Sequence, residues 1–220
     1  MIVLKKEAMT LKGVLSLLAL VLTTFVYAQQ DPAAREVLDA MSNKYRKVPA
    51  FTADFTYTLE NPQEGLNEQF VGKITVKGAK FKLELEGQEI INDGETVWTY
   101  LGEVNEVTIN TYSPDDAEIN LNNIFDLYKT GYKYMMVDDM TTATKKTVDL
   151  VPDDKNLNYF KIRMDITSAG NNLNSFKIFD KSGNRYTYAI TKFTEQPTLS
   201  DKVFVFDIAA HKGVEVIDFR

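Results

Sequence analysis

The sequence predicts a mainly β (α+β) fold, an open or closed antiparallel β-barrel of about 10–11 strands with two helical segments. Three observations lead to this prediction. Apolar and polar residues alternate through most of the chain after position 50, turn-forming stretches separate these runs, and helices and strands do not alternate regularly. Short turns between successive strands favour antiparallel pairing, because a parallel pair needs a longer crossover.

A helix is expected first, over residues 31–45. Asp31 can act as its N-cap, and Pro32 suits the first helical position. Helical spacing places four apolar side chains on one face of this segment: Val37, Leu38, Met41 and Tyr45. The helix is therefore expected to pack on the sheet through this face.

The strands of the expected sheet are recognised by a period of two residues. The first runs through Phe51, Phe55 and Leu59, and a turn at 61–65 separates it from the next. In order, the predicted strands are 51–59, 70–76, 81–85, 97–100, 107–109, 147–151, 159–166, 174–180, 186–193 and 202–208. No linker between them is long enough to divide domains.

The alternation is interrupted between residues 113 and 131, where helical spacing returns. Ser113 can cap this segment and Pro114 suits its first turn. Its apolar stripe consists of Leu121, Ile124, Phe125 and Tyr128. A helix inserted into a sheet at this point could form a movable cover.

Residues 1–28 have the features of a secretory signal peptide. Lys12 precedes an apolar run over 13–26, and Ala28 suits a cleavage site. The run is short for a membrane-spanning helix, which needs about 20 residues. We therefore expect an exported chain with one domain over 29–220. It has no cysteine, so its stability must come from a hydrophobic core rather than from disulfides.

The charge balance restricts the partners. The formal net charge is −6, and removal of residues 1–28 makes it more negative, because that segment holds three lysines and one glutamate. An acidic protein is a poor partner for nucleic acid or for anionic membrane surfaces. We expect no nucleic-acid binding and a monomer.

The residues for catalysis are scarce. His211 is the only histidine and falls in a predicted surface loop, so a histidine metal site and a Ser-His-Asp triad are both weak interpretations. Glu84 and Glu86 alternate with leucines, as on the solvated face of a sheet, and the glycines stand singly in turns. The sequence therefore predicts no enzyme, no metal and no cofactor.

Apolar surface is plentiful instead, with 13 phenylalanines and 11 tyrosines. An ordinary sealed core would account for such residues. A barrel of about ten strands is also wide enough to hold a ligand unless large side chains fill it. Both interpretations are open at this point.

Four stretches of the sequence resemble the family of periplasmic outer-membrane lipoprotein carriers, LolA. They read VPAFTADFTYTLE, GKITVKGAKFKLEL, INDGETVWTY and FVFDIAAHKGVEVIDF, and they are spread across nearly the whole chain after the predicted signal peptide. The third combines a strand, an Asp-Gly turn and Val-Trp-x-Tyr. Residues 111–158 align only loosely.

The resemblance implies an incomplete antiparallel barrel with a helical lid over a cavity for acyl chains. It also implies a periplasmic carrier that accepts acylated lipoproteins from an inner-membrane ABC-type releasing complex and delivers them to an outer-membrane acceptor. Better-known members carry an arginine followed by proline near the end of an early strand. Residues 77–80 read Lys-Gly-Ala-Lys here, so that arginine's role is not transferred.

If the resemblance holds, the lipid-binding residues come from the early strands and the lid. The expected set is Phe55, Tyr57, Leu59, Phe70, Ile74, Val76, Phe81, Leu83, Leu85, Trp98, Tyr100, Leu121, Ile124 and Phe125. Trp98 is expected to anchor the sheet against the lid or the lipid. Two alternatives stay open: a periplasmic sensing module that binds a membrane protein, and a carrier of another amphiphile such as a glycolipid or pigment.

Overall fold

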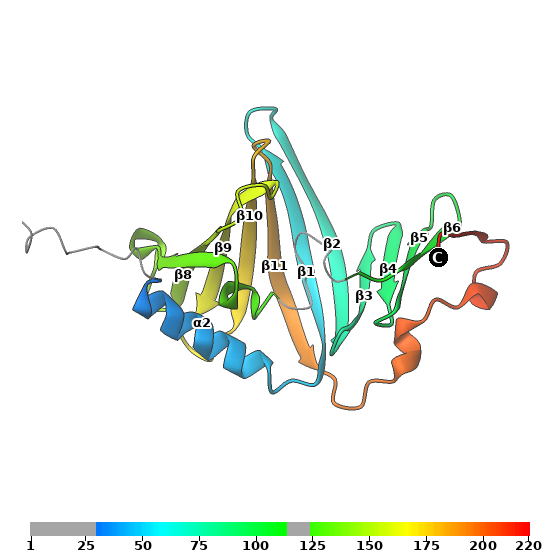
Figure 1. Ribbon diagram of the computed structural model, residues 1–220, viewed down its shortest axis with the longest axis horizontal. Coiled ribbons are helices and arrows are strands. Elements are labelled where there is room, and N and C mark those ends of the chain that lie inside the picture. Colours follow the sequence, from blue (N-terminus) through cyan, green and yellow to red (C-terminus); the bar gives the residue numbers. More distant parts are fainter. Residues whose placement is uncertain (1–29, 114–123) are drawn as a thin grey trace, which may run out of the picture.

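The fold is one open sheet with a helix across its concave face (Figure 1). The computed structural model describes residues 30–113 and 124–220. The described strands follow the spatial order β12-β6-β5-β4-β3-β2-β1-β11-β10-β9-β8-β7, so β12 and β7 lie at opposite ends. The sheet is therefore an incomplete barrel, as the family resemblance implies.

The strand bounds agree with the predicted alternation over most of the chain. The strands are β1 Ala50–Asn61, β2 Leu66–Lys77, β3 Lys80–Leu85, β4 Gln88–Asn92, β5 Thr96–Leu101, β6 Glu106–Thr111, β7 Tyr132–Met136, β8 Lys145–Pro152, β9 Tyr159–Thr167, β10 Leu173–Asp180, β11 Arg185–Glu195 and β12 Glu215–Asp218. Neighbours pair antiparallel except β12, which pairs parallel with β6.

Helix α2, Pro32–Tyr45, begins as the sequence predicts. The Asp31 carboxylate accepts hydrogen bonds from the Ala33 and Ala34 amides. Its second oxygen accepts from Met136 N at 2.9 Å, which ties the helix start to β7. These backbone hydrogen bonds, the one from Met136 first, lower the pKa of Asp31 below its ordinary value despite the opposing effect of burial.

The predicted strand at 202–208 is wrong. The segment forms two short 3₁₀ helices, η5 Asp201–Phe204 and η6 Ile208–Ala210. The Ser200 side chain accepts from Lys202 N, and Asp207 accepts from the amides of residues 209 and 210, so side-chain capping replaces strand pairing. Conversely, strands β4, β7 and β12 were not predicted.

The predicted helix from residue 113 lies partly outside the described residues, which resume at Ile124. The described part consists of a turn at 124–126 and the 3₁₀ helix η3, Leu127–Lys129. The predicted signal peptide, residues 1–28, also lies outside the described residues. Within residues 30–113 and 124–220, no helix is long and apolar enough to cross a membrane.

Two hydrophobic cores lie on opposite faces of the sheet. The large core lies on the concave face, between α2 and strands β1, β2 and β7–β11. The small core contains Ile91, Val107 and Phe206, with Trp98, Tyr100 and Val214 packed against it. We call the segment 201–214, which brings Phe206 and Val214 to this face, the C-terminal strap.

Candidate functional site

The concave face is lined by alternate residues of the long central strands. In the β1–β11 ladder Phe55 pairs with Ile190 and Tyr57 with Tyr188, and in the β1–β2 ladder Ala53 pairs with Ile74. Directly paired residues project to the same face of a sheet. These side chains therefore form one continuous apolar and aromatic surface.

Gly72 shapes this surface. It pairs with Phe55, and a Cβ atom at position 72 would lie 2.5 Å from Phe55 Cζ and 2.8 Å from Leu85 Cδ2. Such distances are not tolerated between carbon atoms without movement. The missing side chain therefore lets the Phe55 ring lie across β2 towards Leu85.

A small apolar cavity lies between the concave face and the segment at 124–129. Its volume is about 40 Å³. It is lined by Phe51, Ala53, Phe55, Ile74, Ile124, Phe125, Leu173, Phe176, Tyr188, Ile190 and Phe193. Sites that hold small molecules usually measure roughly 300–1,000 Å³. The cavity is therefore nearly filled by the protein itself.

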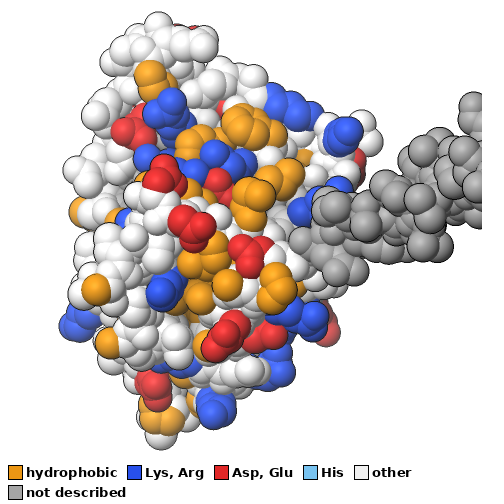
Figure 2. Space-filling view, turned by 90° about the vertical axis from the view of Figure 1, so that its left-hand side faces the viewer, with side chains coloured by type: hydrophobic (Ala, Val, Ile, Leu, Met, Phe, Trp, Pro, Cys, Tyr) orange, Lys and Arg blue, Asp and Glu red, His pale blue; other side chains and the backbone are white. Residues whose placement is uncertain are grey.

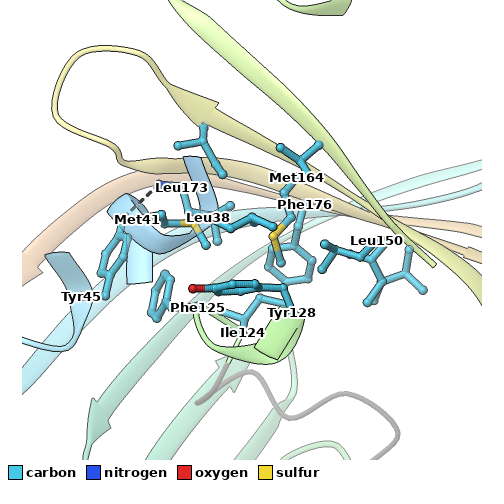
Figure 3. Packing of buried hydrophobic residues seen from close by; sticks show 14 of the residues in the cluster. Leu38, Met41, Tyr45, Ile124, Phe125, Tyr128, Leu150, Met164, Leu173 and Phe176 are labelled. Carbon is cyan, nitrogen blue, oxygen red and sulfur yellow. Dashed lines mark hydrogen bonds between the residues drawn. The ribbon is translucent and has the colours of Figure 1, made fainter. Parts of the chain in front are cut away.

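Two lining residues, Ile124 and Phe125, come from the loop rather than from the sheet. Figure 3 shows them between α2 and the strands, with Phe125 beside Tyr45. The Tyr45 and Phe125 rings stack with centroids 3.7 Å apart, and Phe51 meets Phe125 edge-on at 5.9 Å. We call Ile124 and Phe125 the plug.

Polar contacts hold the plug against α2. The Asp126 carboxylate accepts hydrogen bonds from the Ser42 hydroxyl and from Lys129 Nζ, and Arg46 lies 3.9 Å away. Tyr128 donates to Asp39 at 2.5 Å. We call these contacts of Asp126 and Tyr128 with α2 the latch.

The latch changes the acid-base behaviour of both loop residues. Burial opposes ionisation of Asp126, but the hydrogen bonds from Lys129 and Ser42 and the charges of Lys129 and Arg46 outweigh it and lower its pKa. Burial and the hydrogen bond to Asp39 raise the pKa of Tyr128. At neutral pH Asp126 is therefore ionised and Tyr128 is a neutral donor.

The structure brings together most of the predicted lipid-binding residues. Phe55, Ile74, Ile124 and Phe125 line the cavity. Val76 belongs to the same core, and Tyr57, Phe81, Leu83 and Leu85 pack against it. Phe70 stacks on Tyr57, and Leu59 pairs with Tyr186 further along the concave face. Leu121 lies outside the described residues.

Trp98 and Tyr100 were also placed in the lipid-binding set, and the structure corrects this prediction. Leu83 of the concave face pairs with Ile90, and Ile90 pairs with Thr99, so Trp98 and Tyr100 project to the opposite face. There Tyr100 contacts Phe206 at 5.3 Å and His211 at 4.7 Å. Both residues pack against the small core, which includes Phe206 of the strap, so Trp98 lies on the face opposite the plug.

Sequence reasoning missed the α2 and late-strand half of the site. Leu38, Met41 and Tyr45 are buried in the large core, and the Tyr45 hydroxyl accepts a hydrogen bond from Leu173 N at 3.1 Å (Figure 3). Phe176, Tyr188, Ile190 and Phe193 line the cavity from β10 and β11. Alternation in both strands was visible in the sequence and could have found these residues.

Lys77 and Lys80, at the position where the family's arginine was expected, point away from the plug. Lys77 donates to Leu199 O at 2.8 Å and to Asp201 at 2.7 Å, and Lys80 donates to Asp201 at 3.0 Å. They hold the start of the C-terminal strap. In this chain the latch residues on α2, rather than Lys77 or Lys80, contact the plug segment.

The outer surface differs from the concave face in character. Met135 on β7 and Val151 on β8 are exposed, but charged residues alternate with them in the same ladder, where Lys133 pairs with Val151 and Met135 with Asp149. Figure 2, which views the molecule from the left-hand side of Figure 1, shows hydrophobic and charged side chains interspersed on this surface. This mixed surface is typical of a solvated one.

Groups for catalysis do not converge at the cavity. Lys82 lies 3.5 Å from Glu84 and 3.1 Å from Glu89, in ion pairs away from the cavity. His211 stacks on Phe206 in the small core. Among residues 30–113 and 124–220, no group of three or more His, Cys, Asp or Glu side chains could hold a metal ion.

The fold and the cavity define an incomplete β-barrel with a helix-covered, plugged apolar interior. The family model described as "Outer membrane lipoprotein carrier protein LolA" matches residues 46–207. The chain therefore belongs to the LolA family.

Individual relatives agree with this assignment. An outer-membrane lipoprotein carrier protein of Haemophilus influenzae is 31% identical over 194 residues, covering 86% of this chain and 90% of that protein. An outer-membrane lipoprotein carrier protein of Pasteurella multocida is 28% identical over 218 residues, covering 93% of this chain and 95% of that protein. The crystal structure of an uncharacterized conserved protein from Thermus thermophilus shares the fold, with a TM-score of 0.50, 14% identity, and coverage of 84% and 99%.

Proposed function

We propose that this protein is a non-enzymatic carrier of acylated lipoproteins in the periplasm. It accepts them from an inner-membrane ABC-type releasing complex and delivers them to an outer-membrane acceptor. The observation that carries the proposal is the plug. Among the described residues, Ile124 and Phe125 of a turn complete the cover that α2 forms over the apolar concave face.

The energetics favour exchange of the plug for an acyl chain. Burial of one methylene contributes about 0.8 kcal/mol, so ten methylenes contribute about 8 kcal/mol. Full burial of Ile124 and Phe125 contributes only about 1.5–3 kcal/mol each. A long acyl chain can therefore displace both side chains and the latch, whereas a short one cannot.

The plug also explains how an empty carrier stays soluble. With the plug in place, Ile124 and Phe125 are 4% and 9% exposed, and the neighbouring strand residues are buried or half-buried. An open apolar face of this size would promote association. Release to an acceptor needs no hydrolysis on the carrier. When the acceptor binds the acyl chains more tightly, they leave the apolar face, and the plug takes their place there.

The first test is native mass spectrometry of the mature protein purified from its own periplasm. Co-purification of a triacylated protein would support the carrier role and identify a cargo. A bound glycolipid or pigment would show that the cargo is another amphiphile and not a lipoprotein. A clean protein mass, unchanged after incubation with lipoprotein-containing donor membranes, would contradict the proposal.

A second test asks whether plug movement is required. The protein has no cysteine, so the double variant Ser42→Cys/Asp126→Cys carries a single pair at two positions that now contact each other directly. Oxidation, verified by mass, is expected to lock the plug and abolish lipopeptide binding. Reduction restores binding, so the reduced form is the matched control. Binding by the oxidised form would show that ligand enters elsewhere.

A further inference from the structure

A second, much larger pocket lies at the end of the concave face away from the plug. Its volume is about 500 Å³, against about 40 Å³ for the apolar cavity. It is formed near the β10–β11 turn and includes Tyr57, Asp180 and Asn184. Unlike the cavity, this pocket combines aromatic rings with polar groups, and we call it the tyrosine pocket.

The two spaces are adjacent at Tyr188, which lines both. On one side its ring stacks on Phe176, a cavity residue, with centroids 4.7 Å apart. On the other side it lies 5.0 Å from Tyr57, which stacks on Tyr186 at 6.4 Å. The lining therefore changes across Tyr188 from phenylalanine and isoleucine to tyrosine.

The polar wall of the pocket is fixed by hydrogen bonds. Asp180 accepts from Asn184 N at 2.7 Å, from Asn184 Nδ2 at 2.9 Å and from the Tyr186 hydroxyl at 3.1 Å. Asn61, at the end of β1, donates from its Nδ2 to Asn184 Oδ1 at a distance of 2.9 Å. A preorganised wall of this kind loses little entropy when a ligand binds.

Two hydroxyl groups remain for a ligand. Within residues 30–113 and 124–220, Tyr57 and Tyr188 make ring contacts but no hydrogen bond through their hydroxyls. Burial, followed by the neighbouring tyrosines, raises the pKa of both groups. They are therefore neutral hydroxyls that can donate to an ester or amide carbonyl or accept from a hydroxyl.

The charge of the pocket restricts the ligand further. Of the lining residues in the described part of the chain, Asp180 is the only one charged at neutral pH. A phosphate head group would meet this carboxylate without a cation from the lining to offset it, and like charges in a site are repelled. An uncharged head group meets no such repulsion.

We infer that the tyrosine pocket holds the uncharged ester, amide or hydroxyl groups that join the acyl chains of the cargo to its polar part, while the chains occupy the apolar cavity. The inference rests on the proposed carrier function. It adds a selection rule: neutral acylated heads are accepted and anionic phospholipids are rejected.

The test compares the wild type with the double variant Tyr57→Phe/Tyr188→Phe. These substitutions remove two hydroxyls and no hydrogen bond within the described protein, so folding is expected to be unchanged. The apolar dye N-phenyl-1-naphthylamine reports binding in the cavity. A synthetic triacylated cysteinyl lipopeptide, monopalmitoylglycerol and dipalmitoylphosphatidylglycerol then compete with the dye.

The double variant is expected to bind the dye as the wild type does but the lipopeptide roughly 5- to 100-fold more weakly, the effect of two neutral hydrogen bonds. The matched control Tyr100→Phe, on the opposite face, leaves both affinities unchanged. A loss confined to monopalmitoylglycerol would assign the pocket to a lipid head, and a loss with the lipopeptide would assign it to the lipoprotein. The phosphatidylglycerol is expected to compete at least roughly tenfold less well than monopalmitoylglycerol.

Equal weakening of the dye and the lipopeptide would overturn the inference, because the hydroxyls would then serve the cavity as a whole. So would unchanged affinity for both neutral acylated ligands, or preferential binding of phosphatidylglycerol. If the wild type binds the dye but no acylated ligand, the proposed function itself fails. The wild-type measurement therefore separates the two failures.

Discussion

Strands β1, β2 and β7–β11 bury their apolar side chains on the concave face under α2, whereas strands β4–β6 bury theirs on the opposite face under the C-terminal strap. The sheet is continuous, and β3 joins the two halves. Alternation exists in both halves. Which of the two alternating sets is buried is decided by the segment that covers the strand.

The two covers also differ in how they close. The large core includes a loop plug, Ile124 and Phe125, beside a residual cavity, and its latch is a small number of polar contacts. The small core is closed by Phe206 and by the ion pairs of Asp201 with Lys77 and Lys80. We expect the first cover to move during function and the second to stay in place.

The largest effect is expected from Leu38→Ala on α2. Leu38 is fully buried in the large core, and truncation of a buried leucine costs about 2–5 kcal/mol of unfolding free energy. Denaturant unfolding measures the change, and the exposed α2 residue Glu36, substituted by alanine, should stay within about 0.5 kcal/mol of the wild type. Equal effects at both positions would mean that α2 is not part of the core.

A smaller, local effect is expected from Phe206→Ala. Because Phe206 belongs to the small core and not to the large one, we expect a loss of about 2–3 kcal/mol or less, below the usual 3–5 kcal/mol for this substitution. Trp98 should become more accessible to acrylamide quenching. Its emission in the wild type should stay unchanged when an apolar ligand fills the cavity. A ligand-dependent shift in the wild type would place Trp98 in the lipid site after all.

Local periodicity and capping were sufficient to predict the antiparallel sheet, α2 and its Asp31 cap, whereas the open form of the sheet followed only from the family resemblance. The sequence could not assign Trp98 to a face. Ile90 and Ile91 are both apolar, as are Val97 and Trp98, so neither alternating set in β4 or β5 stands out. The face was decided by Phe206, more than a hundred positions later in the chain.

The strap shows a second limit of sequence reasoning. Phe204 and Phe206 are buried while Val205 is 51% exposed, so the alternation that predicted a strand is real. Extended backbone can bury alternate residues without a pairing strand, and Ser200 and Asp207 favour short helical turns on either side.

The plug was predicted only in part. The apolar stripe of the predicted helix identified Ile124 and Phe125, but the polar contacts of Asp126 and Tyr128 depend on α2 and needed the structure.

A modest effect is expected from Asp126→Ala, which removes the main polar contact of the latch. The Asp126 side chain is 46% exposed, so its ion pairs are worth about 0.5–1 kcal/mol at most. Weaker closure raises the apparent affinity for an apolar ligand by roughly two- to fivefold, because the open form is more populated. Dye titration measures this, with Asp153→Ala, an exposed carboxylate outside the latch, as the control.

The pH dependence of the latch follows from the lowered pKa of Asp126. The stabilising charge is fully present above the ordinary aspartate pKa of about 3.9 and is lost as pH falls through the lowered value. Plug closure should therefore be constant at neutral pH and weaken only in strong acid. An affinity gain on acidification that persists in Asp126→Ala would assign the effect to another group.

The smallest effect is expected from Asp201→Asn, at the start of the strap. Hydrogen bonds from Lys77 and Lys80 lower the pKa of this exposed carboxylate, so the attachment is present above the ordinary aspartate pKa and is lost as pH falls through the lowered value. The asparagine should speed amide hydrogen exchange in residues 201–214 without changing ligand binding. Asp218→Asn is the matched control, because the Asp218 side chain pairs with Arg220 rather than with Lys77 or Lys80. Faster exchange in the plug segment of Asp201→Asn would show that the two covers move together.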